Sequence, residues 1–348
     1  MGVMAVPRLE VNNVVIDYTT RLPGGRSRNL RAVDGVSFSI PKGTTFGLVG
    51  ESGSGKSSLA RAIVGLVAMS EGSVALDGKA IDASKPGKYA SRIQMIFQDP
   101  LSSLNPKSTV FKAIRIPLLL HGICAPDETR SRSTELLTAV GLDESFLDRV
   151  PRELSGGQRQ RVGIARALAV EPEILICDEP VSALDVSIQA EVLQLLQALQ
   201  TERGLTYLFI AHDLAVVAGV SDQIGVMYLG SLAEVGSAGR IVRQPRHPYS
   251  RALLSAQPVP DPLVERSRDR IVLHGDPPSP YEKQLGCPFQ SRCPLSKQLD
   301  SPRICIEERP RLIDVHQSQA VACHFVDGDL AGTDAVLEPN RNHQTKEK

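Results

Sequence analysis

The stretch Gly50-Glu51-Ser52-Gly53-Ser54-Gly55-Lys56-Ser57 fits the pattern G-x-x-x-x-G-K-[ST] at every fixed position. Glycines let a backbone wrap closely around phosphate, the lysine reaches the β- and γ-phosphates, and the last hydroxyl ligates Mg²⁺. A flexible Gly/Ser linker has a similar composition, but a strand-like run (44–49) precedes the match and a helical pattern (57–66) follows it. The sequence therefore predicts a phosphate-binding loop. Its expected nucleotide-binding residues are Gly50, Ser52, Gly53, Ser54, Gly55, Lys56, Ser57 and Ser58.

A pair of carboxylates ends another apolar run, at residues 173–180. Asp178 is placed to hold Mg²⁺, directly or through water, and Glu179 can polarise the water that attacks the γ-phosphate. Acidic pairs are also common at strand ends that do no chemistry. Together with the phosphate-binding loop, we interpret this pair as catalytic.

A second predicted anion site lies between these two motifs. Ser155, Gly156, Gly157 and Gln158 open a helical pattern, and exposed backbone N–H groups at a helix N-terminus bind anions. An ordinary N-capped helix would also place a serine here. Because one nucleotide needs only one phosphate cradle, a second suggests a site that another molecule completes.

Composition limits the classes of protein to be considered. Of 348 residues 42% are apolar, and 39 basic residues balance 39 acidic ones, which argues against a protein that grips nucleic acid mainly through phosphates. The longest apolar stretches, such as residues 114–120, fall short of the roughly 20 residues that cross a bilayer. Residues 1–10 lack the apolar segment of a signal peptide. We expect a cytosolic chain that reaches a membrane only through a partner.

Alternation of strand-like and helical patterns predicts the fold class. Short apolar runs at 93–97, 174–177 and 207–211 are typical of buried parallel strands. Helical periodicity is clearest at 158–170 and 188–202. We therefore expect an α/β core with a largely parallel sheet.

The run Leu154-Ser155-Gly156-Gly157-Gln158, at its distance before Asp178, resembles the signature of ATP-binding cassette (ABC) ATPases. The resemblance covers roughly residues 9–254. It implies a P-loop NTPase cassette with a RecA-like core, an antiparallel β subdomain and a helical subdomain. The expected domains are an ABC ATPase domain (1–257, helical subdomain about 99–170), a small cysteine-containing C-terminal module (258–326) and a disordered tail (327–348).

The resemblance also assigns roles to four residues outside the first motifs. Gln98 matches a glutamine that joins Mg²⁺ and couples to membrane subunits, and Asp185 lies in a loop that crosses the dimer interface. His212 matches the switch histidine at the γ-phosphate, and Tyr18 matches a ring that stacks on adenine. The expected catalytic residues are Lys56, Gln98, Glu179 and His212, and the expected Mg²⁺ ligands are Ser57, Gln98 and Asp178.

In the mechanism that the resemblance implies, two subunits close over two ATP molecules. Each ATP lies between the Lys56 cradle of one subunit and the Ser155 region of the other, and hydrolysis reopens the dimer. Residues 101–122 are either part of the docking surface for membrane helices or ordinary core of the helical subdomain.

Four of the six cysteines, Cys287, Cys293, Cys305 and Cys323, lie in the last fifth of the chain. In a reducing cytosol such a group is more typical of a metal site than of disulfides. Zinc ribbons usually space their cysteine pairs more closely, and four thiolates also suit a [4Fe–4S] cluster. Free thiols without a metal are a third interpretation.

The C-terminal part narrows the family. Residues 246–254, 270–280 and 286–294 resemble segments of the ATPases of dipeptide, oligopeptide and nickel importers, most closely the F-type subunit of dipeptide permeases. This resemblance favours a [4Fe–4S] cluster over Zn²⁺ at the cysteines. It implies an ATP hydrolase that drives import of di- and oligopeptides from the cytoplasmic face of the inner membrane.

The implied partners are two membrane permease subunits, a second ATP-binding subunit (a paralogue, in a heterodimer) and, indirectly, an extracytoplasmic substrate-binding protein. Two alternatives remain for the function. One is the ATPase of an importer of nickel or another small solute. The other is a soluble ABC ATPase outside transport, although such proteins usually carry two cassettes or a long coiled-coil insertion, and neither is seen here.

Overall fold

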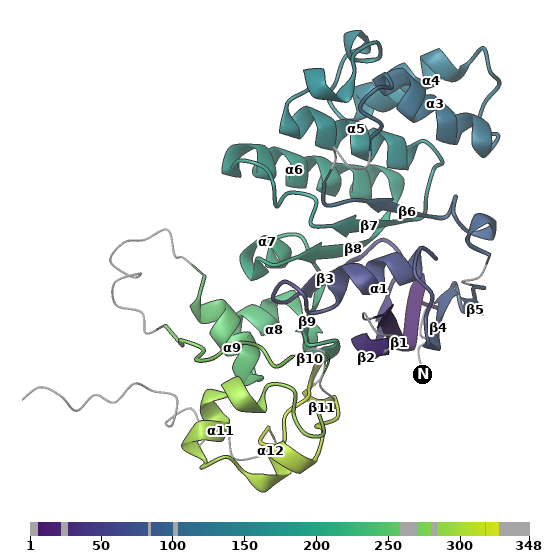
Figure 1. Cartoon of the computed structure of the whole chain (residues 1–348). Coiled ribbons are helices and arrows are strands. Elements are labelled where there is room, and N and C mark those ends of the chain that lie inside the picture. Colours follow the sequence, from purple (N-terminus) through teal and green to yellow (C-terminus); the bar gives the residue numbers. More distant parts are fainter. Residues whose placement is uncertain are drawn as a thin grey trace, which may run out of the picture.

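The structure is a computed structural model that describes residues 6–21, 27–82, 85–99, 104–257, 270–279, 281, 284–316 and 318–326. Two sheets form its scaffold (Figure 1). The predicted tail at 327–348 and most of the proline-rich segment after residue 257 lie outside the described residues.

The larger sheet has the strand order β11-β12-β10-β9-β3-β8-β7-β6. Its parallel strands are β3 (Thr45–Val49), β6 (Ile93–Ile96), β7 (Ile174–Asp178), β8 (Thr206–Ala211) and β9 (Gln223–Tyr228). Its antiparallel strands are β10 (Ser231–Ser237), β11 (Ile313–His316) and β12 (Gln319–Val321). The predicted parallel core is therefore present.

Alternate residues of the central strands enter two separate cores. On β8, Leu208 and Ile210 join the core under the small sheet, whereas Tyr207 and Phe209 join the core under α5 and α6. Side chains of a strand alternate between the two faces of a sheet, so a strand covered on both sides must be apolar throughout. This is why these strands appear in the sequence as continuous apolar runs.

The smaller sheet is antiparallel, in the order β2-β1-β4-β5. Its strands are β1 (Leu9–Arg21), β2 (Ser27–Ile40), β4 (Glu71–Leu76) and β5 (Lys79–Ala80). Together with α1 it covers one face of the larger sheet (Figure 1). The antiparallel subdomain that the ABC resemblance implies is thus observed.

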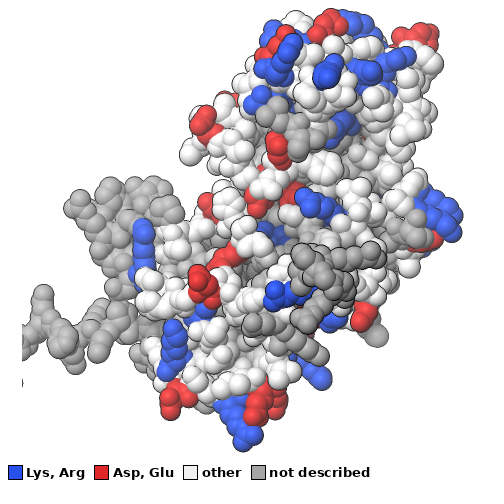
Figure 2. Space-filling model, in the orientation of Figure 1, with Lys and Arg blue, Asp and Glu red and all other residues white. Residues whose placement is uncertain are grey.

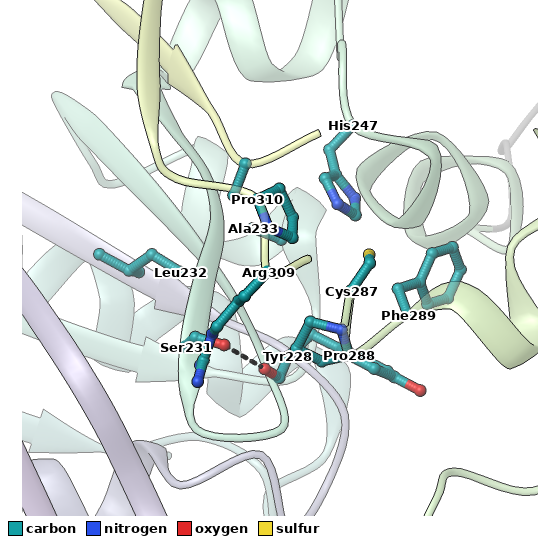
Figure 3. Close-up of a pocket in the computed structure, with 11 residues that line it drawn as sticks. Tyr228, Ser231, Leu232, Ala233, His247, Cys287, Pro288, Phe289, Arg309 and Pro310 are labelled. Carbon is teal, nitrogen blue, oxygen red and sulfur yellow. Dashed lines mark hydrogen bonds between the residues drawn. The ribbon is translucent and has the colours of Figure 1, made fainter. Parts of the chain in front are cut away.

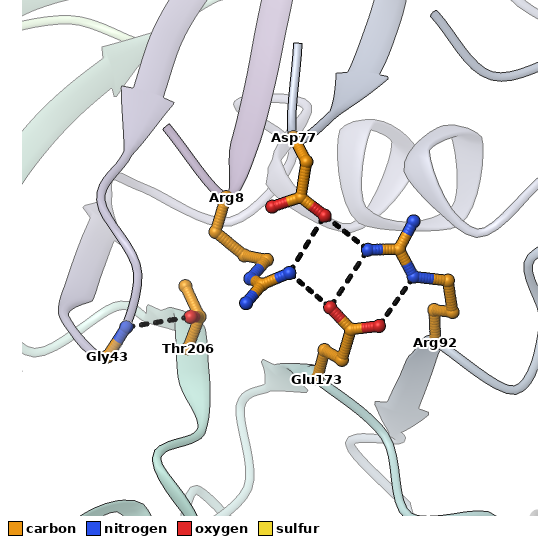
Figure 4. Close-up of polar contacts among 6 residues, drawn as sticks. All are labelled: Arg8, Gly43, Asp77, Arg92, Glu173 and Thr206. Carbon is orange, nitrogen blue, oxygen red and sulfur yellow. Dashed lines mark hydrogen bonds and ion pairs between the residues drawn. The ribbon is translucent and has the colours of Figure 1, made fainter. Parts of the chain in front are cut away.

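Four charged side chains tie the two sheets together (Figure 4). Arg92 donates to both oxygens of Glu173, at 2.6 and 2.8 Å, and also pairs with Asp77. Arg8 lies 2.8 Å from Asp77 and also pairs with Glu173. The bonds from Arg92 hold the pKa of Glu173 below its usual range. The base of β1 is therefore joined to the strands that precede the predicted catalytic residues.

The helices cover the sheets and build a separate helical lobe. The α-helices are α1 (Lys56–Ile63), α3 (Val110–Leu120), α4 (Thr129–Ala139), α5 (Gly156–Leu168), α6 (Val186–Arg203), α7 (Leu214–Ala218), α8 (Ala238–Arg243), α9 (Pro248–Ser255), α11 (Pro294–Gln298) and α12 (Arg303–Glu307). The 3₁₀ turns are η1 (Pro86–Lys88), η2 (Glu144–Phe146), η3 (Pro151–Glu153) and η4 (Gln290–Arg292). None of the described helices is both long and apolar enough to cross a membrane.

Helix α3 shows what the apolar run at 114–120 does. Its buried side chains are Val110, Ile114 and Leu118. Its other side leaves Ile116 54% and Leu120 77% exposed. One face therefore belongs to the core of the helical lobe, while exposed apolar residues remain for the docking role; residues 101–103 of the proposed surface lie outside the described range.

The end of the chain is joined to the cassette rather than standing apart from it. Strand β12 extends the large sheet by pairing with β10. Glu234 of β10 is fully buried, and its carboxylate accepts bonds from the backbone N–H groups of Arg246 and His247 and from the Gln319 amide. Figure 2 shows basic and acidic side chains interspersed over both the helical lobe and this C-terminal region.

Candidate nucleotide site

The loop between β3 and α1 has the backbone geometry that its glycines predicted. Gly53 and Gly55 have φ angles of +79° and +102°, a region that side chains disfavour. A Cβ on Gly50 would lie 2.1 Å from the carbonyl oxygen of Met227, so only glycine lets the loop pass this close to β9. Ser52 lies exposed at the rim. The loop thus curves around the N-terminus of α1.

Lys56 is the buried cation of this loop, with 4% of its surface exposed. Its ammonium group donates to the carbonyl oxygens of Gly50 (2.8 Å) and Glu51 (2.9 Å) and to the Ser54 hydroxyl (3.3 Å). Burial lowers the pKa of Lys56, while nearby carboxylates, Glu179 foremost, act in the opposite direction. A bound phosphate would supply the negative charge that such a buried cation favours.

Ser57 and Asp178 bring together the oxygen donors expected for Mg²⁺. The Ser57 hydroxyl donates to a carboxylate oxygen of Asp178 at 2.9 Å, and Asp178 is only 1% exposed at the end of β7. Burial raises the pKa of Asp178, so a nearby cation would favour its ionised form. Hard oxygen donors of this kind suit Mg²⁺, and the residues present therefore fit the ion.

Glu179 lies beside two other residues that were predicted to act in catalysis, Gln98 and His212. Its carboxylate accepts a bond of 2.7 Å from the Gln98 amide and lies 3.7 Å from Nδ1 of His212. Its backbone has a φ of +48°, an uncommon conformation for a side chain of this size, and its N–H is held by the carbonyl of Ile210. Such backbone strain concentrates at functional sites. The arrangement directs the carboxylate away from the end of β7 toward Gln98 and His212.

Tyr18 is also brought to the loop. Its hydroxyl donates to the Ser58 hydroxyl at 3.2 Å, so the ring lies beside the first turn of α1. This position, on β1, is next to the cradle, as a ring that stacks on a base requires. Its stacking on adenine remains an expectation.

The signature residues form a different kind of structure. The Ser155 hydroxyl accepts from the N–H of Gln158, and the Gln158 side chain accepts from the N–H of Ser155, which is a capping box on α5. A Cβ on Gly157 would lie 2.6 Å from Ile188 of α6. Asp185 is exposed at the start of α6. The hydrogen bonds given for these described residues are local and do not reach the cradle.

The sequence did not lead us to predict three residues that meet at the cradle: Glu51, Tyr249 and Arg292. Glu51 was treated as a variable position of the loop, but its N–H donates to the Tyr249 hydroxyl (2.9 Å) and its carboxylate pairs with Arg292 (2.9 Å). Tyr249 belongs to the quoted segment 246–254, and Arg292 to 286–294. Those two segments carried the resemblance to importer ATPases, which is the signal in the sequence that marks them as important. No pattern of neighbouring residues predicts that either segment contacts the phosphate loop.

The four C-terminal cysteines line one small cavity, together with His247, His324 and other side chains. Figure 3 shows the neighbouring pocket, where Cys287, Phe289 and His247 gather beside Tyr228. Burial raises the pKa of Cys287 to about 12 and that of Cys323 to about 11. These two partly buried thiols therefore favour their protonated form in the absence of a nearby cation.

The observed positions do not form a site for a single ion. Within the described ranges, no group of three or more His, Cys, Asp or Glu side chains lies close enough to hold one. Tetrahedral Zn²⁺ would need its thiolates about 3.8 Å apart, from Zn–S bonds of about 2.3 Å. The zinc alternative has no support in this geometry. Four cysteines line one cavity, which is the number of thiolate donors that a [4Fe–4S] cluster uses, and the cluster is therefore only a proposal.

Comparison with known proteins agrees with the geometry of the cassette. The profile of the ABC transporter family matches residues 33–182, and that of the oligopeptide/dipeptide transporter C-terminal region matches residues 233–298. The putative oligopeptide transport ATP-binding protein YkfD of Bacillus subtilis is 47% identical, covering 99% of this chain and 98% of its own. The oligopeptide transport ATP-binding protein OppF of Escherichia coli is 49% identical, covering 86% and 89%.

Solved structures show the same fold. The dimeric ATP-binding cassette MJ0796 in a post-hydrolysis state with ADP and Pi is 31% identical, with a TM-score of 0.59, over 66% of this chain and 98% of that one. CbiO1 from Clostridium perfringens, part of an ABC transporter complex, is 29% identical, with a TM-score of 0.58, over 68% and 91%. The predicted P-loop cassette is therefore confirmed.

Proposed function

The chain belongs to the ABC transporter family of ATPases, and on that premise we propose that it hydrolyses MgATP to drive the import of di- and oligopeptides. The observation that carries the proposal is the convergence of a phosphate loop, a buried Ser57–Asp178 pair and a Glu179–Gln98 pair in one site. Relatives named for oligopeptide transport match nearly the whole chain, and the C-terminal family match supports the same branch.

The residues divide the chemistry among them. The loop N–H groups and Lys56 bind the phosphates, and Ser57, Asp178 and Gln98 hold Mg²⁺, which neutralises charge on the phosphates when bound. Glu179 accepts a proton from the attacking water, and His212 contacts the γ-phosphate. Tyr18 stacks on adenine. The 2.7 Å bond from Gln98 supports this division, since it keeps the Glu179 carboxylate oriented.

A second ATP-binding subunit completes the site. The Ser155–Gln158 cap points a helix N-terminus outward, and its bonds are local, which supports a role toward the nucleotide of another subunit. Asp185, exposed before α6, lies in the loop that would cross the interface. We expect the second subunit to be a paralogue. A related cassette, MJ0796, has a dimeric structure with ADP and Pi.

Transport requires partners of the kind that importers use. Two membrane permease subunits would dock near Gln98 and the exposed apolar face of α3, and an extracytoplasmic binding protein would deliver the peptide. The chain would then work as a peripheral subunit on the cytoplasmic face of the inner membrane. Exposed Ile116 and Leu120 support α3 as part of this contact.

The four C-terminal cysteines support a finer proposal, a [4Fe–4S] cluster as a structural cofactor. Their side chains line one cavity, two of them buried and two partly buried, and a metal there would stabilise the thiolates. A cluster would hold together a segment that leaves many of its apolar side chains exposed, among them Leu285, Leu299 and Ile306. Its role here is structural, without a redox step.

The function is tested on the complete transporter. The chain is purified with its co-purifying membrane subunits, reconstituted in liposomes and assayed for ATP hydrolysis with peptide-loaded binding protein. Peptides should stimulate hydrolysis, and Glu179→Gln should lower the rate by about 100-fold or more while leaving ATP bound. Glu202→Gln, an exposed carboxylate on α6, is the matched control and should keep full activity. Stimulation by nickel in place of peptides would establish the alternative importer, and a near-normal rate in Glu179→Gln would refute its role.

A further inference from the structure

The backbone of the phosphate loop is anchored at Glu51 from three directions. The carbonyl oxygen of Glu51 accepts from Lys56 at 2.9 Å. Its N–H donates to the Tyr249 hydroxyl at 2.9 Å. Its carboxylate accepts from Arg292 at 2.9 and 3.1 Å. Every polar group of Glu51 is therefore engaged, and two of its partners, Tyr249 and Arg292, come from segments about 200 or more residues along the chain.

Arg292 reaches Glu51 from the cysteine-rich segment. It ends the 3₁₀ turn η4 (Gln290–Arg292), whose N–H groups bond back along the segment: Gln290 to the Cys287 carbonyl (3.0 Å) and Arg292 to the Phe289 carbonyl (3.1 Å). Next in the chain is Cys293. The position of the guanidinium group is thus set by the same short stretch that carries two of the four cysteines.

Phe289 fixes this stretch against the cassette. Its ring is 2% exposed and lies 5.2 Å from the ring of Tyr228 and 5.3 Å from that of Tyr249. Tyr228 ends β9, and Tyr249 is the residue that bonds the Glu51 N–H. Aromatic contacts of this kind hold geometry as well as burying area. Arg292 and Tyr249 are therefore presented to Glu51 by one packed unit.

Charge gives the pair a consequence for nucleotide binding. Glu51 belongs to the loop that receives a triphosphate, and an unpaired carboxylate there would repel the incoming phosphates. The Arg292 side chain is 10% exposed and that of Glu51 is 30% exposed, so water screens their interaction only in part. One guanidinium nitrogen of Arg292, Nη1, reaches both carboxylate oxygens of Glu51, so the positive charge lies directly against the carboxylate that it neutralises.

We infer that Arg292 is a positioning residue for the phosphate cradle: from the cysteine-rich segment it neutralises Glu51 and so raises the affinity of the loop for MgATP. The inference rests on the nucleotide site of the proposed function and not on the metal proposal. Because the side-chain hydrogen bonds of Arg292 go to Glu51 and Tyr228 and not to Glu179, it should affect binding of ATP and leave the hydrolytic step unchanged.

Titration of the full chain with a fluorescent ATP analogue and Mg²⁺ tests this inference. Arg292→Gln should weaken binding about tenfold, the scale of one partly screened charge interaction. Glu51→Gln should bind as tightly as the wild type or more tightly. The double variant Glu51→Gln/Arg292→Gln should return to within about threefold of the wild type, because it removes the repelling charge together with its partner.

Arg309→Gln is the matched control. Arg309 makes another ion pair between the C-terminal segment and the cassette, with Asp34, but does not bond the loop. It should bind the analogue like the wild type. In the assembled transporter, Arg292→Gln should raise the KM for ATP and leave kcat within about twofold.

Several outcomes overturn the inference. Wild-type affinity in Arg292→Gln would do so, and so would a double variant as weak as Arg292→Gln, which would make the arginine a structural support only. Thermal melting checks that each variant folds; should Arg292→Gln unfold, Glu51→Gln decides, since a purely structural pair requires it to bind more weakly. If the wild type itself binds no MgATP, the proposed function fails; if it binds and Arg292→Gln equals it, only this inference fails.

Discussion

The phosphate loop (50–57) and the cysteine-rich segment (284–326) both make polar contacts at the predicted nucleotide site, yet these contacts are formed in different ways. In the loop, Lys56 finds its three acceptors within six residues of itself. In the segment, Arg292 finds its carboxylate 241 residues away, and β12 pairs with β10, which also lies far from it in the sequence. The loop is nearly complete as a local structure, whereas the segment acquires its geometry from the cassette.

This difference explains what each region can do alone. A loop with its own bonds and a helix behind it binds phosphate by local geometry. A segment with few buried apolar residues depends on specific contacts for its stability. These are the packing of Phe289 against tyrosine rings, the Arg292–Glu51 ion pair and the packing or binding of its four cysteines. Loss of the loop's buried cation, Lys56, should therefore abolish nucleotide binding, whereas changes in the segment should alter the affinity by degrees.

The largest effect is expected in the loop. Lys56→Ala removes the buried cation whose place beside Gly50 and Glu51 defines the cradle, and should weaken MgATP binding by at least about 100-fold. Isothermal titration of the full chain measures it. Lys42→Ala, an exposed lysine just before β3, should bind normally. Unchanged MgATP affinity in Lys56→Ala would show that the loop does not bind the phosphates.

The next effect concerns the cysteines. Purified without oxygen, the chain should be brown and contain about four iron and four sulfide per molecule. Cys293→Ser should lose this content and lower the melting temperature, because a staple of the segment is removed. Cys124→Ser, outside the segment, should keep the full content. Colourless protein, with zinc or without metal, would overturn the cluster and leave a segment held by packing alone.

A smaller effect is expected from pH. His247 is 3% exposed where α9 meets β12, and burial lowers its pKa from 6.5 to about 4. The folded chain thus binds this proton less tightly than the unfolded chain. The stability that His247 contributes is full above about pH 6.5 and is lost as the pH falls toward 4, by roughly 3 kcal/mol.

Urea denaturation from pH 7 to pH 4 measures that loss. His247→Asn keeps a side chain that can cap α9 but does not titrate, so its stability should fall about 3 kcal/mol less over the same range. The exposed His274→Asn should follow the wild type. A His247→Asn curve parallel to that of the wild type would show that the junction does not depend on this buried ring.

Most elements of the cassette were predictable from the sequence because their signals are local. The apolar runs at 93–97, 174–177 and 207–211 became β6, β7 and β8, and the helical patterns at 158–170 and 188–202 became most of α5 and α6. Strand order was not predictable in the same way. The insertion of β12 beside β10 depends on pairing between distant segments, which no periodicity records.

The residues of the candidate site also divide into those that local motifs predicted and those that local motifs could not predict. Lys56, Ser57, Asp178 and Glu179 were found because their motifs follow strands whose ends meet at one edge of a parallel sheet. Gln98 and His212 depended on the family resemblance, and the structure brings both to Glu179. Glu51 was overlooked, since its role lies in its partners and not in its place in the motif.

The cassette, the phosphate loop and the acidic pair were predictable from the amino-acid sequence, because each follows from chemistry that neighbouring residues share. The anchoring of the loop by Tyr249 and Arg292, from much later in the chain, became visible in the folded molecule. Backbone curvature and strand character arise from adjacent residues. The neutralisation of a carboxylate depends on which charge folding brings beside it.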